Sequence, residues 1–374
     1  MAFDVSISSN NKGASDLAAQ AMVVVTEEIG QDTQWELQFE LLPDGGDLPR
    51  LTDARLSPTA EVAIFAKNDL LGLTCLAVGP VEGQSIRILN GGEGSSFAVY
   101  GRSAEARMDQ TEKVSVHQGL TSTDATIVAG IFASHTFVPD LDPTFMMRPP
   151  GGHPIVQRCT DLQLVRQLAR RNGMHFWLSH KAAPVGPIAT IAHFKKLEPS
   201  ILPAVPELKI NGGRDFLGAQ KANISSLDIS YDTVAPTKIE ADGIDSGNGK
   251  AINGTAALPA MQGLGETPFE AIVPEQAMRL TSAADGAGDL TGMAEGVLSS
   301  AQFFIRASCE VAAKDVGPLH AHDTVRVTGA GSRHSGRYIV ERVAHRFDDG
   351  GHIMDLTLVR NAWGEESFTP IPGI

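Results

Sequence analysis

Apolar and polar residues alternate with a period of two over several short segments in the first third of the chain. The clearest run places Trp35, Leu37, Phe39 and Leu41 between polar residues, which is typical of a strand with one buried face. Further short candidates span residues 61–67, 85–89 and 96–100, and proline or glycine clusters separate them. The pattern predicts a small antiparallel sheet or barrel.

The same period returns near the C-terminus in longer runs. Residues 303–311, 324–328, 338–346 and 353–360 alternate in this way, and glycine-rich turns separate several of them. We therefore expect a meander of long strands. Residues 224–231 also alternate, so we expect this strand to join the meander and form a second barrel that the intervening segment interrupts.

Two segments between these regions have helical spacing. Residues 123–135 begin with N-cap residues and carry apolar residues three and four apart. Thr160 and Gln163 predict a capping box for a second helix over 160–172, which Gly173 ends. We expect both helices to pack on the core rather than to bind partners. Residues 139–154 hold five prolines and predict a linker or long loop.

The length of 374 residues suits two or three domains rather than one compact core. The fold class predicted is mainly β with α+β insertions, built on two antiparallel β-barrels and smaller inserted domains. Residues 240–300 contain nine acidic and two basic residues with ten glycines, and we interpret them as an insertion of loops with one short helix. The expected divisions are 1–112 for the first barrel, 113–222 for an α+β middle domain, 223–239 with 302–374 for the second barrel, and 240–301 for the acidic insertion.

The charge balance and the cysteines exclude several classes of protein. Thirty basic and 44 acidic residues give a net charge of −14, which argues against specific binding of nucleic acid. The N-terminal segment does not resemble a signal peptide, and no window is apolar enough to span a membrane. We therefore expect synthesis in the cytoplasm and no membrane partner. Cys75, Cys159 and Cys309 are too far apart to indicate a disulfide framework or a zinc knuckle.

Few residues are candidates for chemistry. The segment 243–250 has a glycine spacing one residue too long for a phosphate loop, and Ala251 replaces the Ser or Thr that would hold magnesium. His320 and His322, followed by Asp323, form the one metal-like cluster, for which a solvated turn is the favoured alternative.

Other histidine and tryptophan residues are candidates for structural roles. His345 and His352 are expected to face each other across a hairpin as polar surface residues. Trp177 and Trp363 are either interface anchors or internal packing residues. The residues therefore predict no catalytic, cofactor-binding or metal site, and no cofactor.

Three segments together resemble the phage late control D and VgrG-type tail hub family. They are Gly101–Asp109 followed by Thr121–Val128, the helix and strand over Thr160–Trp177, and the closing hairpin over Ser335–His345 with Met354–Arg360. The matches occur in the order of the family and span about residues 35–363. Leu164 departs from the family, since an aromatic residue is frequent there, and the glycine usual before the strand at Thr324 is missing.

The resemblance implies a non-enzymatic baseplate hub with two tail-tube-like barrels in each chain. It further implies a homotrimer whose six barrels adapt a six-fold tail tube to a three-fold spike, in contact with other baseplate proteins. Hubs of the VgrG type usually continue into a spike, whereas this sequence ends shortly after its last predicted strand. The resemblance therefore implies a separate spike protein, in a virion tail or a phage-like contractile injection particle assembled in the bacterial cytoplasm.

Two other functions stay open at the level of sequence. One is a tail-associated peptidoglycan hydrolase, although no paired-carboxylate motif is visible, and the other is a glycan- or receptor-binding tail protein. For the charge, we hypothesise that acidic residues of the barrels line the channel while 240–300 projects outward. The alternative is that the acidic excess only keeps the subunit soluble.

Overall fold

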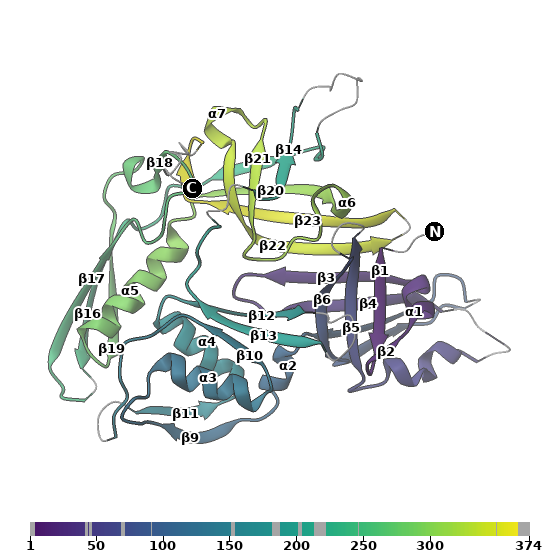
Figure 1. Ribbon diagram of the computed structural model, residues 1–374, viewed down its shortest axis with the longest axis horizontal. Helices are drawn as coiled ribbons and strands as arrows, with labels where there is room; N and C mark the ends of the chain where they lie inside the picture. The colour runs from purple at the N-terminus through teal and green to yellow at the C-terminus, as the bar shows by residue number, and fades with distance from the viewer. Residues whose placement is uncertain are drawn as a thin grey trace.

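The computed structural model describes residues 4–365 except 42–43, 45–46, 69–71, 91, 151–153, 182–187, 201–203, 213–221, 246 and 349. Strands dominate the chain, and the predicted fold class, mainly β with α+β additions, is confirmed (Figure 1). No helix among the described residues is long and apolar enough to cross a membrane.

The largest sheet has ten strands and combines the two ends of the sequence. Its main path runs β15-β20-β23-β22-β3-β4-β8-β7, and β14 and β21 extend it from β22. The strands are β3 (Ala21–Glu28), β4 (Gln34–Glu40), β7 (Gly83–Arg87), β8 (Ser96–Arg102), β14 (Glu207–Lys209), β15 (Asp228–Tyr231), β20 (Ile305–Ala312), β21 (Thr324–Thr328), β22 (Gly336–Asp348) and β23 (Gly351–Arg360). The predicted C-terminal meander is confirmed, and β15 joins it by pairing with β20.

The N-terminal and C-terminal strands of this sheet meet where β3 pairs antiparallel with β22. The pairing runs from Arg342 opposite Glu28 to Phe347 opposite Val23. Four strands lie on each side of this junction along the main path. Separate hydrophobic cores lie in the two halves, one around Leu37 and Phe97 and the other around Tyr338 and Leu356.

A seven-stranded sheet follows the order β10-β13-β12-β6-β5-β1-β2. Its strands are β1 (Val5–Ser9), β2 (Lys12–Gly13), β5 (Glu61–Asn68), β6 (Gly72–Pro80), β10 (Val138–Leu141), β12 (His175–Lys181) and β13 (Ala189–Lys195). A two-stranded ribbon of β9 (Lys113–His117) and β11 (Ile155–Cys159) lies beyond the helices at the edge of the molecule (Figure 1). Smaller elements are α1 (Ser15–Gln20), η1 (Pro49–Thr52), η2 (Ala54–Leu56), α2 (Glu105–Met108), α6 (Ala313–Val316), α7 (Gly331–His334) and β24 (Ala362–Trp363).

The two helices α3 (Asp124–Ser134) and α4 (Asp161–Arg171) form where the spacing predicts them. The Thr123 hydroxyl accepts a bond from the Thr126 backbone, and Thr126 bonds back to Thr123, so the cap closes from both sides. Thr160 accepts from the Gln163 backbone at 3.3 Å. Gly173 ends α4 with φ of 62°, a backbone conformation that favours glycine.

The acidic segment 240–301 is more regular than predicted. It contains most of a three-stranded sheet of β16 (Lys238–Asp245), β17 (Ala251–Ala257) and β19 (Ala277–Ala284), together with β18 (Thr267–Pro268) and η3 (Phe269–Ala271). The 15-residue helix α5 (Ala287–Ala301) packs on this sheet through a core that includes Leu290 and Leu298. The prediction of loops with one short helix is wrong, because glycine and small polar residues mask the alternation of these strands.

This insertion leaves and rejoins the ten-stranded sheet at neighbouring positions. It follows Tyr231 at the end of β15 and precedes Ile305 at the start of β20, and these two residues lie opposite each other in the sheet. Both large sheets combine strands from different segments of the expected domain division. The division into separate domains stays a prediction.

A buried ion network joins the predicted linker to α3, α4 and the insertion. Arg148, fully buried, donates to the Asp124 carboxylate from Nε at 2.9 Å and from Nη2 at 3.1 Å, and it also pairs with Asp285. Arg171 at the end of α4 pairs with Asp285 and Asp289. Segment 139–154 is therefore anchored at Arg148, which the proline content did not indicate.

Gly173, just after α4, and Gly296 in α5 allow the two helices to approach each other closely. A Cβ added at Gly296 would lie 2.9 Å from the Cα of Gly173 and 3.0 Å from the carbonyl oxygen of Arg170. Both of these neighbours are backbone atoms, so a side chain at residue 296 can fit only if one helix moves.

We expect Gly296→Ala to lower the free energy of unfolding by about 1–3 kcal/mol, because a methyl group there overpacks the contact between the helices. The matched control is Gly288→Ala in the same helix, whose Cβ would meet nothing within 4 Å. Alanine favours a helix by up to about 1 kcal/mol over glycine, so the control should be unchanged or more stable. Chemical denaturation measures both, and equal stability of the two variants would contradict this packing.

Arg148→Met should lower the free energy of unfolding by about 3–5 kcal/mol, because it leaves the buried carboxylate of Asp124 without its cation and removes one of the two arginines that pair with Asp285. Arg158→Met is the control, since Arg158 is exposed on β11 and pairs with no carboxylate among the described residues. Its effect should stay within about 0.5 kcal/mol. Similar losses for the two variants in urea denaturation would show that the network is not a structural anchor.

Candidate assembly interface

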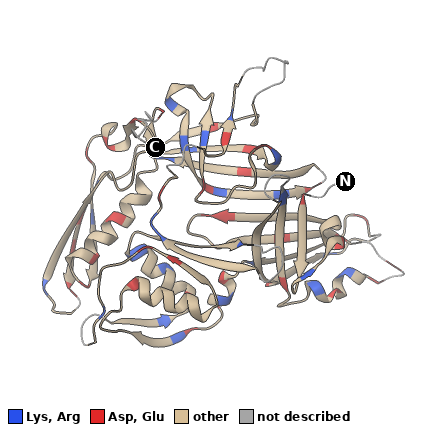
Figure 2. Cartoon of the chain, in the orientation of Figure 1, with Lys and Arg blue, Asp and Glu red and all other residues tan. Residues whose placement is uncertain are grey.

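One face of the ten-stranded sheet is largely polar and is open over most of its main path, apart from a buried cluster of Leu264, Ile339 and Val359. In β20, for example, Ile305, Ala307, Cys309 and Val311 are buried while the residues between them are exposed. By register, the open face carries the acidic residues Glu28, Glu36, Glu40, Asp228, Glu310, Asp348 and Asp355 and the arginines Arg87, Arg102, Arg306, Arg342 and Arg346. Figure 2 shows the two signs interspersed rather than separated.

Ion pairs neutralise most of the arginines on this face. Arg346 of β22 contacts Glu310 at 2.8 Å and Asp355 at 2.9 Å. Arg342 lies 3.7 Å from Glu28 across the β22–β3 junction. Such exposed pairs contribute little stability, but they leave a surface of mixed sign with a slight acidic excess.

The two ends of the main path are edge strands with exposed apolar side chains. At the β7 end, Ile86 is 48% exposed and Ile88 is 63% exposed. At the β15 end, Tyr231 is 58% exposed and Val234 is 84% exposed. In the described part of the chain β7 pairs only with β8, and β15 only with β20. An open edge that is also apolar is a surface suited to pairing with another chain.

A cluster of ionisable residues lies at the junction of the two halves. We call Glu27, His320, His345 and His352 the histidine seam. His320 Nδ1 lies 2.9 Å from a Glu27 carboxylate oxygen, and His345 Nδ1 lies 2.9 Å from His352 Nε2. His345 and His352 face each other as predicted, but both are buried, so their expected place on the surface is wrong.

The histidines of the seam have pKa values shifted in opposite directions. Burial lowers the pKa of His345 well below its usual value and that of His352 to about 4. Burial would also lower the pKa of His320, but the Glu27 carboxylate overrides this effect and raises it to about 9. At neutral pH the seam therefore holds one charged histidine and one neutral pair.

His322 packs against the middle of the chain. Its ring stacks on Trp177 with centroids 4.0 Å apart, and His193 stacks on Trp177 at 4.6 Å. His193 in turn bonds to Asp140 at 2.8 Å. The favoured alternative of a solvated turn is wrong for His322, whose ring nitrogens are buried and have no partner among the described residues.

The other sequence candidates have structural roles. Gly243 and Ile244 lie in β16, and residues 247–250 precede β17, where Asp245 at the end of β16 accepts bonds from the Gly247 and Asn248 backbones. A phosphate loop instead precedes a helix. Trp363 packs at the edge of Phe304, with Arg333 over its ring at 3.9 Å, so both tryptophans pack within the chain. Among the described residues no three His, Cys, Asp or Glu side chains are grouped to hold a metal ion.

Comparison with solved structures identifies proteins with a similar fold. No protein-family model matches the sequence, and no curated protein matches it. The tail protein from Neisseria meningitidis MC58 superposes with a TM-score of 0.63 at 13% identity, over 97% of this chain and 98% of that one. The 43 kDa tail protein of prophage MuSo2 from Shewanella oneidensis gives 0.60 at 10% identity, over 96% and 97%.

The chain has the fold of phage tail proteins. The c3393 protein of E. coli, described as a type VI secretion component similar to the T4 tail proteins gp27 and gp5, superposes with a TM-score of 0.54 at 11% identity, over 95% of this chain and 77% of that one. The three sequence segments that resemble tail hubs correspond to β8 with α2 and α3, to α4 with β12, and to the β22–β23 hairpin. The resemblance is therefore confirmed at the level of the fold.

Substitutions in the histidine seam should change stability with opposite dependences on pH. Wild-type His352 has a folded pKa of about 4 against 6.5 unfolded, so its contribution is present above pH 6.5 and is lost as the pH falls toward 4. The destabilisation caused by His352→Gln should then be smaller at pH 5 than at pH 7.5, by on the order of 1–2 kcal/mol.

Glu27→Gln provides the opposite case. His320, with a folded pKa raised to about 9, stabilises the fold fully below pH 6.5 and loses this effect as the pH rises through 9. The destabilisation by Glu27→Gln should shrink between pH 7 and pH 10. Urea denaturation at these pH values measures both effects, and pH-independent differences would contradict the assigned protonation states.

Proposed function

We propose that this chain is a structural, non-enzymatic baseplate hub of a phage tail or a phage-like contractile particle. The observation that carries the proposal is the eight-strand path of the ten-stranded sheet, with two four-strand halves and an apolar open edge at each end. The tail-protein fold over nearly the whole chain supports it. The structural similarity to a type VI secretion component also supports the proposal.

In this proposal three copies form a closed ring. The β7 edge of one copy pairs with the β15 edge of the next, a head-to-tail contact that closes when the rotation is one third of a turn. Each copy contributes two halves, so three copies give six similar units, which suits a six-fold tube on one side and a three-fold spike on the other. Other baseplate proteins contact the outside of the ring.

The open polar face then lines the channel. Its paired arginines and slight acidic excess suit the passage of DNA or an acidic protein, since a wall without a field of positive charge does not retain a polyanion. In the proposed ring the insertion of β16, β17, β19 and α5 projects from the β15 end of the sheet toward neighbouring baseplate proteins.

We expect Ile86→Asp and Tyr231→Asp to abolish ring formation while the subunit stays folded. A carboxylate at either position would be buried without a partner in the contact, and association should weaken more than about a hundredfold. Val114→Asp is the control, because Val114 is 87% exposed but lies on the β9–β11 ribbon far from both edges. Native mass spectrometry measures the free protein, and electron microscopy of particles assembled with each variant shows whether the hub is present.

Two results would contradict the proposal. Trimers that form equally well with the edge variants would exclude pairing through β7 and β15. Particles in which this chain forms no ring around the tail axis would exclude the hub itself.

A further inference from the structure

Five of the eleven histidines of the chain gather where β12 and β13 meet the turn before β21. His175 and His180 lie in β12 and His193 lies in β13, while His320 and His322 lie in the turn. The strands β12 and β13 belong to the seven-stranded sheet, and β21 belongs to the ten-stranded sheet. We call these five residues the inter-sheet histidines. Figure 1 shows β12 and β13 running between the ten-stranded sheet and the helices α3 and α4.

His322 occupies a strained position in which its ring has no polar partner. Its backbone φ of 78° lies in the region that favours glycine, and its buried ring nitrogens form no hydrogen bond among the described residues. The ring stacks on Trp177 with centroids 4.0 Å apart, and the ring of His175 meets it edge-on at 5.9 Å. A neutral imidazole suits this position, since a proton would add a charge and a second N–H group without an acceptor.

His180 lies where β12 pairs with the other half of its sheet. Among the described residues the ladder between β12 and β6 is a single pair, His180 opposite Cys75, whereas the ladder between β12 and β13 covers residues 175–181. Nε2 of His180 lies 2.7 Å from the Ser103 hydroxyl, and its Nδ1 lies 3.1 Å from the Thr190 hydroxyl. The connection between β12 and the N-terminal strands therefore depends on a buried imidazole bonded to two neutral hydroxyl groups.

Few carboxylates among the described residues face these rings, and those that do are already bonded. Glu27 accepts a bond from His320 at 2.9 Å, and Asp140 accepts one from His193 at 2.8 Å. Asp323 accepts the backbone N–H of His320 at 2.7 Å. The other charged groups nearby are mainly cations: Arg107 facing His180, Lys181 and Lys195 facing His193, and Arg166 and Arg170, together with Glu341, lining a cavity with His175. Further protons in this contact would therefore meet mainly like charges.

The inter-sheet histidines respond to pH through their burial. Burial lowers the pKa of His180 and of His322 to about 3, against 6.5 for an exposed ring. It also lowers the pKa of His175 and of His193. Each of these rings favours the closed contact fully above pH 6.5 and opposes it increasingly as the pH falls. Between the two pKa values, each histidine raises the equilibrium constant for opening by up to about tenfold per pH unit.

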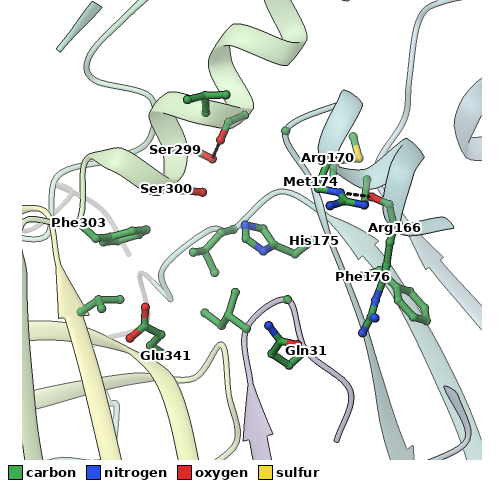
Figure 3. A pocket seen from close by; sticks show the side chains of 18 of the residues that line it. Gln31, Arg166, Arg170, Met174, His175, Phe176, Ser299, Ser300, Phe303 and Glu341 are labelled. Carbon is green, nitrogen blue, oxygen red and sulfur yellow. Dashed lines mark hydrogen bonds between the residues drawn. The ribbon is translucent and has the colours of Figure 1, made fainter. Parts of the chain in front are cut away.

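Solvent has a path to one end of this contact. A cavity of about 890 Å³ lies between α4, the last turns of α5 and the β3–β4 turn. His175 at the start of β12 lines this cavity, as Figure 3 shows. Protons can therefore reach the rings from this side. Because the cavity leaves space beside the start of β12, the strand can shift there without first displacing packed side chains.

We propose that the inter-sheet histidines form an acid-sensitive joint within the chain. When the pH falls to about 5, protons enter the contact, and the layer of β10, β12 and β13 separates from β6 and from the turn before β21. The ten-stranded sheet keeps its ladders during this change. A return to neutral pH removes the protons and closes the joint again.

The test labels the cysteines of the full-length chain with dithiodipyridine, a reagent that reacts with thiols in acid, and locates the label by mass spectrometry. Cys75 in β6 is buried and packs with Ile188, the residue before β13, so separation uncovers it. Cys309 in β20 reports on the ten-stranded sheet, and the partly exposed Cys159 calibrates the reagent. From pH 7.5 to pH 5.0 the labelling rate of Cys75 relative to Cys159 should rise at least about tenfold, while that of Cys309 stays unchanged.

His322→Phe keeps a ring on Trp177 but cannot take up a proton, and it loses no hydrogen bond among the described residues. Cys75 should react in this variant as in the wild type at pH 7.5, with an acceleration at pH 5.0 that is at least about threefold smaller. The matched control is His334→Phe, because the His334 ring in α7 also forms no hydrogen bond among the described residues and lies outside the contact. The control should show the full acceleration.

A second variant keeps the test valid if His322→Phe already uncovers Cys75 at pH 7.5. His175→Gln then takes its place, because the partly exposed His175 ring forms no hydrogen bond among the described residues. An equal acceleration at Cys309 would indicate general acid unfolding and would overturn the proposal. An unchanged rate at Cys75, or a full acceleration in the substituted chain, would also overturn it. The free chain suffices for these measurements, so their result is independent of the proposed hub function.

Discussion

The antiparallel pairing of β3 with β22 is the constraint on which the rest of the structure depends. It joins strands more than 300 residues apart in sequence into one sheet, from Arg342 opposite Glu28 to Phe347 opposite Val23. A shift by one residue would turn Arg342 and Arg346 into the core and expose Val343 and Phe347. The cost of burying those guanidinium groups fixes the register, and the register fixes both the open face and the histidine seam beneath it.

The peripheral parts are attached by a different kind of interaction. Arg148, Asp124, Asp285, Arg171 and Asp289 connect the helical layer to the insertion through buried ion pairs. Because an unpaired charge in such a network is costly, the contact is specific in geometry even where it adds little net stability. The glycine contact at Gly296 and Gly173 then fixes how closely α5 approaches the end of α4.

The local sequence pattern predicts many of the helices and strands, but it does not predict which strands pair with each other. Some features depend only on residues that are close in sequence, so the sequence predicts them. These features are the alternation of residues 35–41 and 303–311 and the helix caps at Thr123 and Thr160. The strands of 240–301 were missed because Gly243, Gly254 and small residues carry little hydrophobic signal. The pairing of β3 with β22 and the burial of His345 and His352 depend on contacts distant in sequence, which the periodicity of the sequence does not encode. The resemblance to tail hubs supplied the fold where periodicity could not.

The insertion is held at its base by the sheet itself, because Tyr231 and Ile305, which flank it, lie opposite each other in β15 and β20. The two chain ends of the insertion are therefore brought together whether or not it is present, and its length costs the sheet little closure entropy. Related chains can exchange, enlarge or shorten this module without altering the wall that carries it. The site at which it joins the sheet is thus a natural point of divergence, where one common scaffold can be adapted to different surroundings.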